Sequence, residues 1–334
     1  MKTVSIVTHA YNEEENIEAL YLRVREIMAE VGKYPYEHIF IDNASTDSTA
    51  AILKRIAVDD HHVKVIVNAR NFGHIRSPIH ALFQATGDVM IGIASDFQEP
   101  PDLIPEMIRE WEQGNEMVLC VKRSSGESSL FFWLRKQYYA FVERVSSVET
   151  IQNFTGFGLY SRRAVDLVKS FNDPYPYFRG IIAEIGLPHT RLYFDQPARK
   201  RGFSKNNFYT LYDIAMLGIT NLTKVPLRMM TFTGFAGALL SFLIAIGYLL
   251  AKILYWSNFT LGLAPLIIGI FFFSSIQLVF MGILGEYIGA IYTFIQKKPY
   301  AVERERIGFD KGLSLPDAQA QLNLGASASE VRAQ

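Results

Sequence analysis

The chain has 334 residues, which allows about two domains at roughly 100–200 residues each. It carries 33 Lys and Arg residues against 33 Asp and Glu residues, so the net charge is zero. This balance argues against a nucleic-acid binder that depends on a large basic face. The single cysteine, Cys120, excludes an internal disulfide and a zinc site built from several cysteines. Hydrophobic residues make up 49% of the chain, too many for a mostly disordered protein.

The N-terminal part of the chain alternates between short Val- and Ile-rich runs and longer stretches of helical pattern. The runs predict strands at Val4–Thr8, His38–Asp42, Val63–Asn68, Val89–Ala94 and Val118–Lys122. The stretches between them predict helices at Glu13–Val31, Thr46–Ala57, Ile75–Ala85 and Asp102–Glu112. This alternation predicts an α/β domain over residues 1–205, with a mostly parallel sheet covered on both faces.

Two long stretches without charged side chains come later in the chain. Met229–Ala251 contains 23 residues and Tyr255–Gly285 contains 31, whereas about 20 apolar residues cross a bilayer as a helix. Two buried helices of a soluble core are the alternative, but Leu266–Phe273 is apolar on every face. The connection near Trp256–Gly262 has no Lys or Arg, while Lys and Arg flank the outer ends. We therefore expect a transmembrane hairpin with both chain ends in the cytoplasm.

The rest of the chain is divided by composition. Residues 206–228 are apolar with few charges and predict an amphipathic helix at the bilayer surface, although an ordinary core helix has the same pattern. Residues 229–290 hold the two predicted transmembrane helices. Residues 291–334 form a cytoplasmic tail, which we expect to be poorly ordered after about Asp310. The sequence thus predicts an integral protein of the inner or plasma membrane with its α/β domain in the cytoplasm.

Polar segments follow four of the predicted strands, and ligands of parallel sheets bind at the carboxyl ends of the strands. The segments are Thr8–Glu13, Asp42–Asp47, Asn68–Gly73 and Ser95–Pro101. Asp42 and Asp96 are candidate ligand-binding residues, whereas helix capping is an equal alternative for Ser45 or Asp47. Neither common glycine-rich phosphate loop is present. A divalent cation, Mg²⁺ or Mn²⁺, would replace such a loop, and Asp96 and Gln98 offer oxygen ligands for it.

As an ordered set, these segments resemble the motifs of a known family. The matching segments are Tyr11–Ile17, Ile41–Asp47, Arg70–Gly73, Asp96–Pro101, Phe178–Gly180, Arg199–Gly202, Ser204-Lys205, Val225–Arg228 and Gly282–Gly289. They resemble inverting glycosyltransferases of the GT-A fold, in the polyprenyl-phosphate branch that includes dolichyl-phosphate mannose synthase and bactoprenol glucosyltransferase. The resemblance runs from about residue 3 to 300.

The resemblance implies a nucleotide-sugar donor, with UDP as the expected nucleotide, and a polyprenyl-phosphate acceptor in the membrane. It assigns nucleotide binding to Tyr11, Glu13, Asp42, Arg70 and Ser95. It assigns metal binding to Asp96 and Gln98, and catalysis to Asp96, Arg199 and Lys205. Arg123 and Arg135 are assigned to the acceptor phosphate. A solvated surface cation is the alternative for each basic residue. The resemblance further implies a homo-oligomer, a tetramer in bactoprenol-type relatives.

The chemistry implied by this resemblance requires little proton transfer. A phosphate acceptor is already anionic near neutral pH, so it can attack the anomeric carbon without a general base. The protein must instead align the two substrates and stabilise the diphosphate leaving group. A single displacement of this kind inverts the anomeric configuration.

Three departures from the family pattern remain. Ala94 replaces the first Asp of the Asp-x-Asp motif, Gly156 stands where many relatives carry an Asp, and His9-Ala10 replaces Pro and an apolar residue. We read them as marks of a diverged subgroup with a different sugar. Two other functions stay open: a GT-A enzyme with another acceptor, and a catalytically silent subunit that binds nucleotide sugars, which Ala94 favours.

Overall fold

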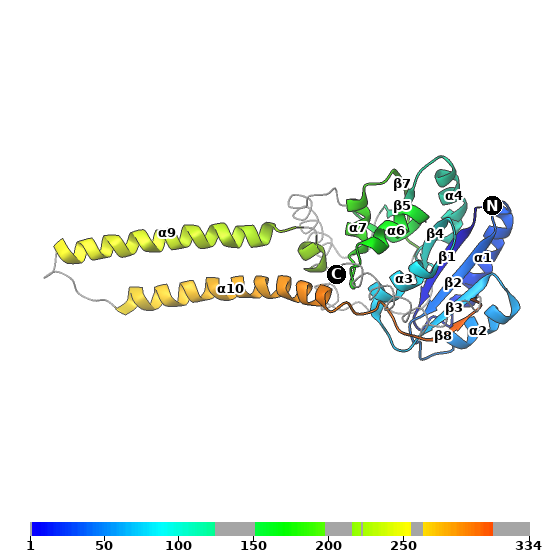
Figure 1. Ribbon diagram of the computed structural model, residues 1–334, viewed down its shortest axis with the longest axis horizontal. Helices are drawn as coiled ribbons and strands as arrows, with labels where there is room; N and C mark the ends of the chain where they lie inside the picture. The colour runs from blue at the N-terminus through cyan, green and yellow to red at the C-terminus, as the bar shows by residue number, and fades with distance from the viewer. Residues whose placement is uncertain (1, 124–150, 198–215, 222, 255–262, 310–334) are drawn as a thin grey trace, which may run out of the picture.

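The computed structural model describes residues 2–123, 151–197, 216–221, 223–254 and 263–309 (Figure 1). The strands within these ranges form one sheet with the order β7-β5-β6-β4-β1-β2-β3-β8. Their bounds are β1 Val4–Ala10, β2 Tyr36–Asp42, β3 Val63–Asn68, β4 Val89–Ala94, β5 Met117–Lys122, β6 Phe154–Ser161, β7 His189–Phe194 and β8 Glu303–Ile307. The centre of the sheet, β4-β1-β2-β3, is parallel throughout, and β5 and β7 form another parallel pair. β6 runs antiparallel to β4 and β5, and β8 antiparallel to β3.

Helices cover both faces of the sheet, which confirms the predicted α/β class (Figure 1). Their bounds are α1 Ile17–Val31, α2 Thr49–Asp59, α3 Gly73–Gln84, α4 Ile104–Glu112 after the 3₁₀ turn η1 Pro101–Leu103, α6 Arg162–Ser170 and α7 Phe178–Ile185. Buried side chains of α1, α2 and α4 pack on one face, and those of α3, α6 and α7 on the other. The central strands are buried on both faces, so their side chains are apolar on both faces. This is why they appear in the sequence as continuous apolar runs.

Helix α1 begins four residues later than the predicted start at Glu13. The preceding residues form a separate turn, in which the backbone N–H of Asn16 donates to the carbonyl of Glu13 at 3.0 Å. The backbone N–H of Glu13 donates to Thr49 Oγ1 at 2.8 Å. At its other end, α1 stops at Gly32, whose φ of 55° closes the helix with a bond to the carbonyl of Met28. The polar segment after β1 therefore remains a loop that is available for binding.

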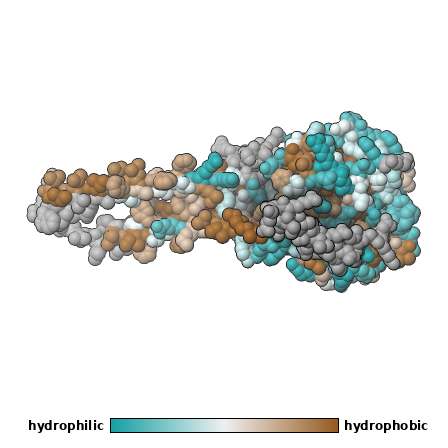
Figure 2. All heavy atoms as spheres, in the orientation of Figure 1, coloured by the Kyte–Doolittle hydropathy of each residue, from teal (hydrophilic) through white to brown (hydrophobic). Residues whose placement is uncertain are grey.

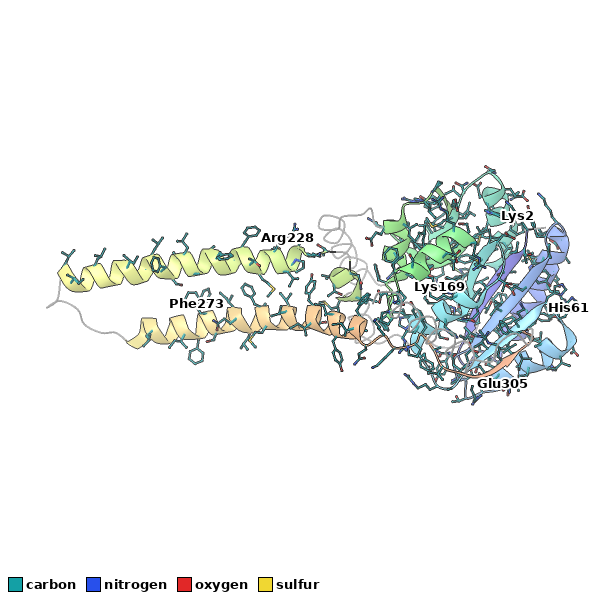
Figure 3. The ribbon with its side chains drawn as sticks, viewed as in Figure 1. Lys2, His61, Lys169, Arg228, Phe273 and Glu305 are labelled. Carbon is teal, nitrogen blue, oxygen red and sulfur yellow. The ribbon has the colours of Figure 1, made fainter. Side chains whose placement is uncertain are left out.

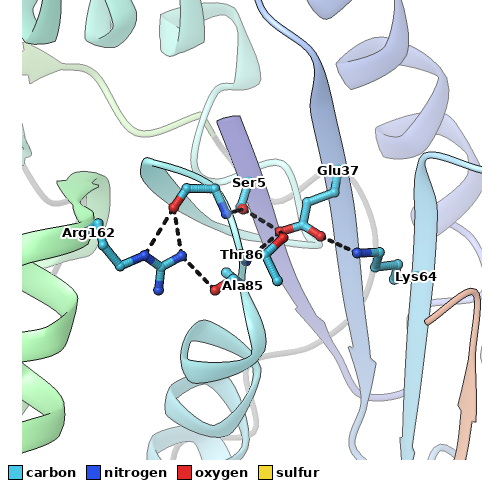
Figure 4. Close-up of polar contacts among 7 residues, drawn as sticks. Ser5, Glu37, Lys64, Ala85, Thr86 and Arg162 are labelled. Carbon is cyan, nitrogen blue, oxygen red and sulfur yellow. Dashed lines mark hydrogen bonds and ion pairs between the residues drawn. The ribbon is translucent and has the colours of Figure 1, made fainter. Parts of the chain in front are cut away.

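The amino-terminal edge of the sheet is closed by a polar network (Figure 4). The buried Glu37 carboxylate accepts hydrogen bonds from Ser5 Oγ at 2.5 Å, from the Thr86 N–H at 2.6 Å and from Lys64 Nζ at 2.6 Å. Beside it, Arg162 Nη2 donates to the carbonyl of Ala85 at 2.7 Å. Buried charges are tolerated only when paired in this way. The contacts tie the N-terminal strand ends together and leave the carboxyl edge as the place for a ligand.

Two long apolar helices, α9 (Val225–Leu254) and α10 (Leu263–Ile295), extend side by side away from the sheet (Figure 1). Val225–Ile244 and Gly269–Ile295 are long and apolar enough to cross a membrane, and almost none of either stretch is buried. Figure 2 shows hydrophobic residues along both helices and hydrophilic ones over much of the sheet domain. Arg228 lies at the end of α9 nearest that domain, and Phe273 lies along α10 (Figure 3). An exposed apolar surface of this extent fits a protein associated with a membrane.

The bounds of α9 and α10 differ from those of the two uncharged stretches in the sequence, Met229–Ala251 and Tyr255–Gly285. The second helix, Leu263–Ile295, continues ten residues beyond Gly285, where the uncharged stretch ends. Of the predicted surface helix at 206–228, residues 216–221 are helical, as is the start of α9, and 206–215 lie outside the described residues. The expectation of disorder after Asp310 also falls outside them. The segment 303–307, predicted to belong to the cytoplasmic tail, adds strand β8 to the edge of the sheet.

Candidate functional site

The sheet register brings the four polar segments to one edge. Ala10 pairs with Asp42, Asp42 pairs with Val67, and His9 pairs with Ala94, so β1, β2, β3 and β4 end close to the same line. The loops after these strands therefore lie next to one another. This places the predicted nucleotide and metal residues from four distant parts of the sequence on one side of the domain.

Each of the four loops contains a residue with positive φ. The angles are 57° at Asn12, 60° at Ala44, 84° at Gly73 and 58° at Phe97. For side chains such as Ala and Phe this left-handed backbone costs about 1–2 kcal/mol per residue. Such conformations persist where the surrounding structure enforces them, and they cluster at ligand sites. These residues with positive φ therefore lie at the same edge of the sheet as the four polar segments.

Hydrogen bonds between the loops hold this backbone in place. The N–H of Asn12 donates to Ser45 Oγ at 2.9 Å, and the N–H of Thr46 donates to Asn12 Oδ1 at 2.8 Å. The buried Asn43 side chain accepts from the Phe72 N–H at 2.9 Å and donates to the Gly73 carbonyl at 3.2 Å. The loops after β1, β2 and β3 are therefore one cross-linked unit, with side chains fixed before any ligand binds.

Asp42 lies fully buried at the end of β2, and its Oδ2 accepts the backbone N–H of Ser45 at 3.1 Å. Burial raises the pKa of this carboxyl; hydrogen bonds from Ser45 lower it, the charge of Asp47 raises it, and that of Arg304 lowers it. Arg304 belongs to the tail strand β8, so a cation from the end of the chain acts on this carboxylate. The contact with Ser45 also gives Asp42 a structural role in shaping the loop.

The other predicted nucleotide-binding residues lie along the same edge. Tyr11 and Glu13 are half-buried in the loop after β1, and Ser95 is buried directly after β4. Arg70 is exposed after β3, with its guanidinium 4.1 Å from the centroid of the Phe72 ring. The arrangement is consistent with one shared ligand, and the individual roles remain predictions.

Asp96 and Gln98 lie in one turn after β4, where Asp96 Oδ1 accepts the backbone N–H of Gln98 at 3.1 Å. Asp96 is only 8% exposed. Mg²⁺ in nucleotide-binding proteins typically takes one or two carboxylates and completes its shell with phosphates and water. A carboxylate and an amide oxygen in one turn at the carboxyl edge of the sheet fit such an ion. His9, at the end of the neighbouring strand β1, pairs with Ala94. Burial lowers the pKa of its imidazole, the charge of Asp96 raises it, and the charge of His74 lowers it.

Glu99, for which the sequence predicted no individual role, connects this turn to the neighbouring strand β6. Its carboxyl accepts the Ala94 N–H at 2.8 Å and the Thr155 hydroxyl at 3.0 Å. The pKa of Glu99 is raised to about 7. Burial raises it most, and the charge of Asp96 adds to this; the hydrogen bonds from Ala94 and Thr155 and the charge of Lys122 act in the opposite direction. Glu99 thus fixes the end of β4 to the start of β6, next to Gly156, one of the three positions that depart from the family pattern. The sequence signal was its place next to Gln98.

The basic residues predicted for the phosphates are only partly described. Arg123, directly after β5, has its Nη1 3.6 Å from Asp195 Oδ2, and both side chains are more than 60% exposed. Arg135, Arg199 and Lys205 lie outside the described residues. Two basic side chains with no predicted role are His74 at the start of α3 and Arg179 in α7. Burial and the charge of Arg179 lower the pKa of His74, which in turn acts on His9 beside Asp96.

Comparison with known proteins gives the following likenesses. Residues 5–172 match the model of Glycosyl transferase family 2. The SfII prophage-derived bactoprenol glucosyl transferase of Shigella flexneri is 33% identical over 91% of this chain and 99% of its own length. An uncharacterized glycosyltransferase of Synechocystis is 30% identical over 89% of this chain and 93% of its own. Among solved structures, glucosyl-3-phosphoglycerate synthase from Mycobacterium tuberculosis covers 66% of this chain and 76% of its own, with 18% identity and a TM-score of 0.45.

Proposed function

The chain belongs to glycosyl transferase family 2, and on that premise we propose that it transfers a sugar from a UDP-sugar to a polyprenyl phosphate, with inversion at the anomeric carbon. The observation that carries this proposal is the Asp96–Gln98 turn at the open edge of a domain whose chain continues into two exposed apolar helices. The turn fits the donor diphosphate, and the helices fit an acceptor with a hydrocarbon tail. The likeness to the Shigella bactoprenol enzyme extends over both parts.

In the proposed donor complex, the cross-linked loops bind the nucleoside through Tyr11, Glu13 and Asp42. Arg70 and Ser95 lie at the same edge and contribute to nucleotide binding. Asp96 and Gln98 would hold Mg²⁺ or Mn²⁺, which supplies positive charge against the diphosphate leaving group. Because these loops are fixed by hydrogen bonds, little reorganisation is required when charge develops on the leaving group.

In the proposed acceptor complex, the phosphate attacks as an anion, so the chain need not supply a general base. The basic residues that we assign to phosphate contacts are Arg123, Arg135, Arg199 and Lys205, with Arg199 and Lys205 in catalysis. Their task is to hold two anionic groups close together while the bond to the sugar is exchanged, which Arg and Lys do through charge-assisted hydrogen bonds.

The proposed location is the cytoplasmic face of the inner or plasma membrane, with α9 and α10 as transmembrane helices. A pocket at the base of α10 is lined by polar and apolar side chains, including Asp173, Leu217, Thr220 and Phe294. A lining of this kind suits the boundary between a lipid tail and its charged head. Homo-oligomerisation is part of the proposal, and the mass of the detergent-solubilised particle tests it.

Transfer to lipid by the purified chain tests the function. With undecaprenyl phosphate and a panel of radiolabelled UDP-sugars, we expect one sugar to enter the solvent-extractable lipid, a chelator to stop transfer, and Mg²⁺ or Mn²⁺ to restore it. Asp96→Asn should reduce transfer about a hundred-fold or more without lowering the melting temperature. Asp102→Asn, at an exposed ion pair with Arg23, is the matched control and should retain activity.

Two results would contradict the proposal. Nucleotide binding without transfer to any lipid would favour the silent subunit that Ala94 suggested. Undiminished transfer by Asp96→Asn would remove this residue from the site.

A further inference from the structure

We propose that the strand after the two apolar helices completes the donor site, with Arg304 of β8 as a nucleotide-binding residue. The inference rests on the proposed nucleotide-sugar donor and adds a contact from a part of the chain that no motif assigns. Its basis is the way in which β8 is attached to the sheet, the register shift at Arg304, and the distance across the sheet to Asp42.

Strand β8 is firmly attached along the edge of β3. Val65 pairs with Ile307 and Ile66 with Arg306, and the Ala69 N–H donates to the carbonyl of Val302 at 2.8 Å. After the strand, Gly308 approaches so closely that a Cβ there would lie 2.5 Å from the Val63 carbonyl oxygen. Both ends of β8 are therefore packed closely against β3.

A buried carboxylate secures the end of β8 that is nearest the site. The Glu303 side chain is 3% exposed and accepts hydrogen bonds from His80 Nε2 at 2.6 Å and from Arg306 Nε at 2.7 Å. Burying a carboxylate is costly unless it is paired and hydrogen-bonded, as it is here. The residue that follows, Arg304, is therefore held at a fixed place along the sheet.

The register shifts at this point and changes the direction of Arg304. Glu305 pairs with Val67 while Glu303 pairs with Asn68, which leaves Arg304 as an extra residue on β8. A bulge of this kind redirects a side chain and is frequent next to active sites. Glu303 contacts α3 and Glu305 contacts Lys54 of α2, so the two neighbours of Arg304 point to opposite faces of the sheet.

The sheet geometry places Arg304 close to the nucleoside end of the site. Asp42 pairs with Val67, and Val67 with Glu305, so Asp42 and the bulge are separated by two strand spacings, about 10 Å in all. Over this distance the positive charge of Arg304 lowers the pKa of Asp42. Within the described ranges, Arg304 is exposed and no hydrogen bond or ion pair engages its guanidinium. A guanidinium that no described residue engages, next to the proposed nucleotide site, fits an anionic or carbonyl-rich ligand such as UDP.

Titration of the full-length chain in detergent with UDP tests the inference. We expect Arg304→Ala to weaken UDP binding about ten-fold, the size expected for one charge-assisted hydrogen bond, with an unchanged melting temperature. Arg304→Lys keeps the charge and should recover part of the affinity. Glu305→Gln is the matched control, because it alters the adjacent residue of the same strand, and it should bind UDP as the wild type does.

The outcomes separate the two proposals. Equal UDP affinity in the wild type and in Arg304→Ala overturns the role of Arg304 and leaves the proposed function intact. An equal loss of affinity in Glu305→Gln would show a general effect of disturbing β8 and would also overturn it. Failure of the wild type to bind UDP overturns the proposed donor together with this inference.

Discussion

The strongest stability prediction concerns Glu303, the buried carboxylate of the tail strand. Burial raises its pKa, but hydrogen bonds from His80 and Arg306 outweigh burial and lower it to about 2 from an ordinary 4.5. At about 1.4 kcal/mol per pH unit, this shift corresponds to roughly 3 kcal/mol of stability for the charged form. Because the side chain is 3% exposed, solvent screening reduces this value little.

The sign of the pH dependence follows from the lowered pKa. The folded protein holds the carboxylate charged more strongly than the unfolded chain does, so the stabilisation is complete above about pH 5 and is lost as the pH falls through 4.5 toward 2. Glu303→Gln keeps the shape and removes the charge. We expect it to lower the free energy of unfolding by about 2–3 kcal/mol at pH 7, and by clearly less at pH 3.

Hydrogen exchange read by mass spectrometry is the suitable assay, because β8 can detach from β3 without global unfolding. Amides of residues 303–307 should lose about 30- to 100-fold in protection in Glu303→Gln at pH 7. Glu305→Gln serves as the control, since its ion pair with Lys54 is about 40% exposed and worth little. Equal protection in Glu303→Gln and the wild type would refute the reasoning, as would a difference that does not shrink in acid.

Three further changes test other parts of the structure. Asn43→Ala removes the bonds to Phe72 and Gly73, so it should cost about 2–3 kcal/mol in chemical denaturation and weaken nucleotide binding. Gly156→Asp introduces the residue that the family resemblance implies at this position, where φ is 105°, and we expect about 1–2 kcal/mol of strain in thermal unfolding. Gly92→Ala is the control and should be nearly neutral. A chain that ends at Lys298 lacks β8 and exposes the edge of β3, so it should aggregate on size-exclusion chromatography; a monodisperse profile equal to that of the full chain would contradict this.

The central strands and the edge at which they end were predictable from the sequence, because each strand is marked by its own short run of apolar residues. A parallel strand buried on both faces reads as an apolar run, and a polar residue such as Asp42 or Asp96 must mark the place where the run ends. The three later strands were not predictable in this way. β6 contains Gly156 and Gly158, which weaken a strand pattern, and β8 reads Glu-Arg-Glu-Arg-Ile, which resembles an exposed charged segment.

The roles of residues whose contacts lie far away along the chain could not be predicted from the sequence either. Glu99 is notable because its carboxyl meets Thr155, which is far along the chain and starts an unpredicted strand. Arg304 reaches the site only because β8 pairs with β3. In both cases the decisive contact depends on the order of strands in the sheet, which hydrophobic periodicity does not encode.

The order of segments along the chain has a structural consequence. The chain leaves the α/β domain, forms α9 and α10, and then returns to supply the edge strand of the same sheet. Only seven residues separate Ile295 at the end of α10 from Glu303 at the start of β8. Both ends of that connection are anchored, by the helix on one side and by the buried Glu303 on the other. A displacement of α10 relative to the domain would therefore pull on β8, and through β8 on the loop after β3 that is bonded to Asn43. The seven-residue connection and β8 therefore join the proposed transmembrane helix α10 to the proposed nucleotide site.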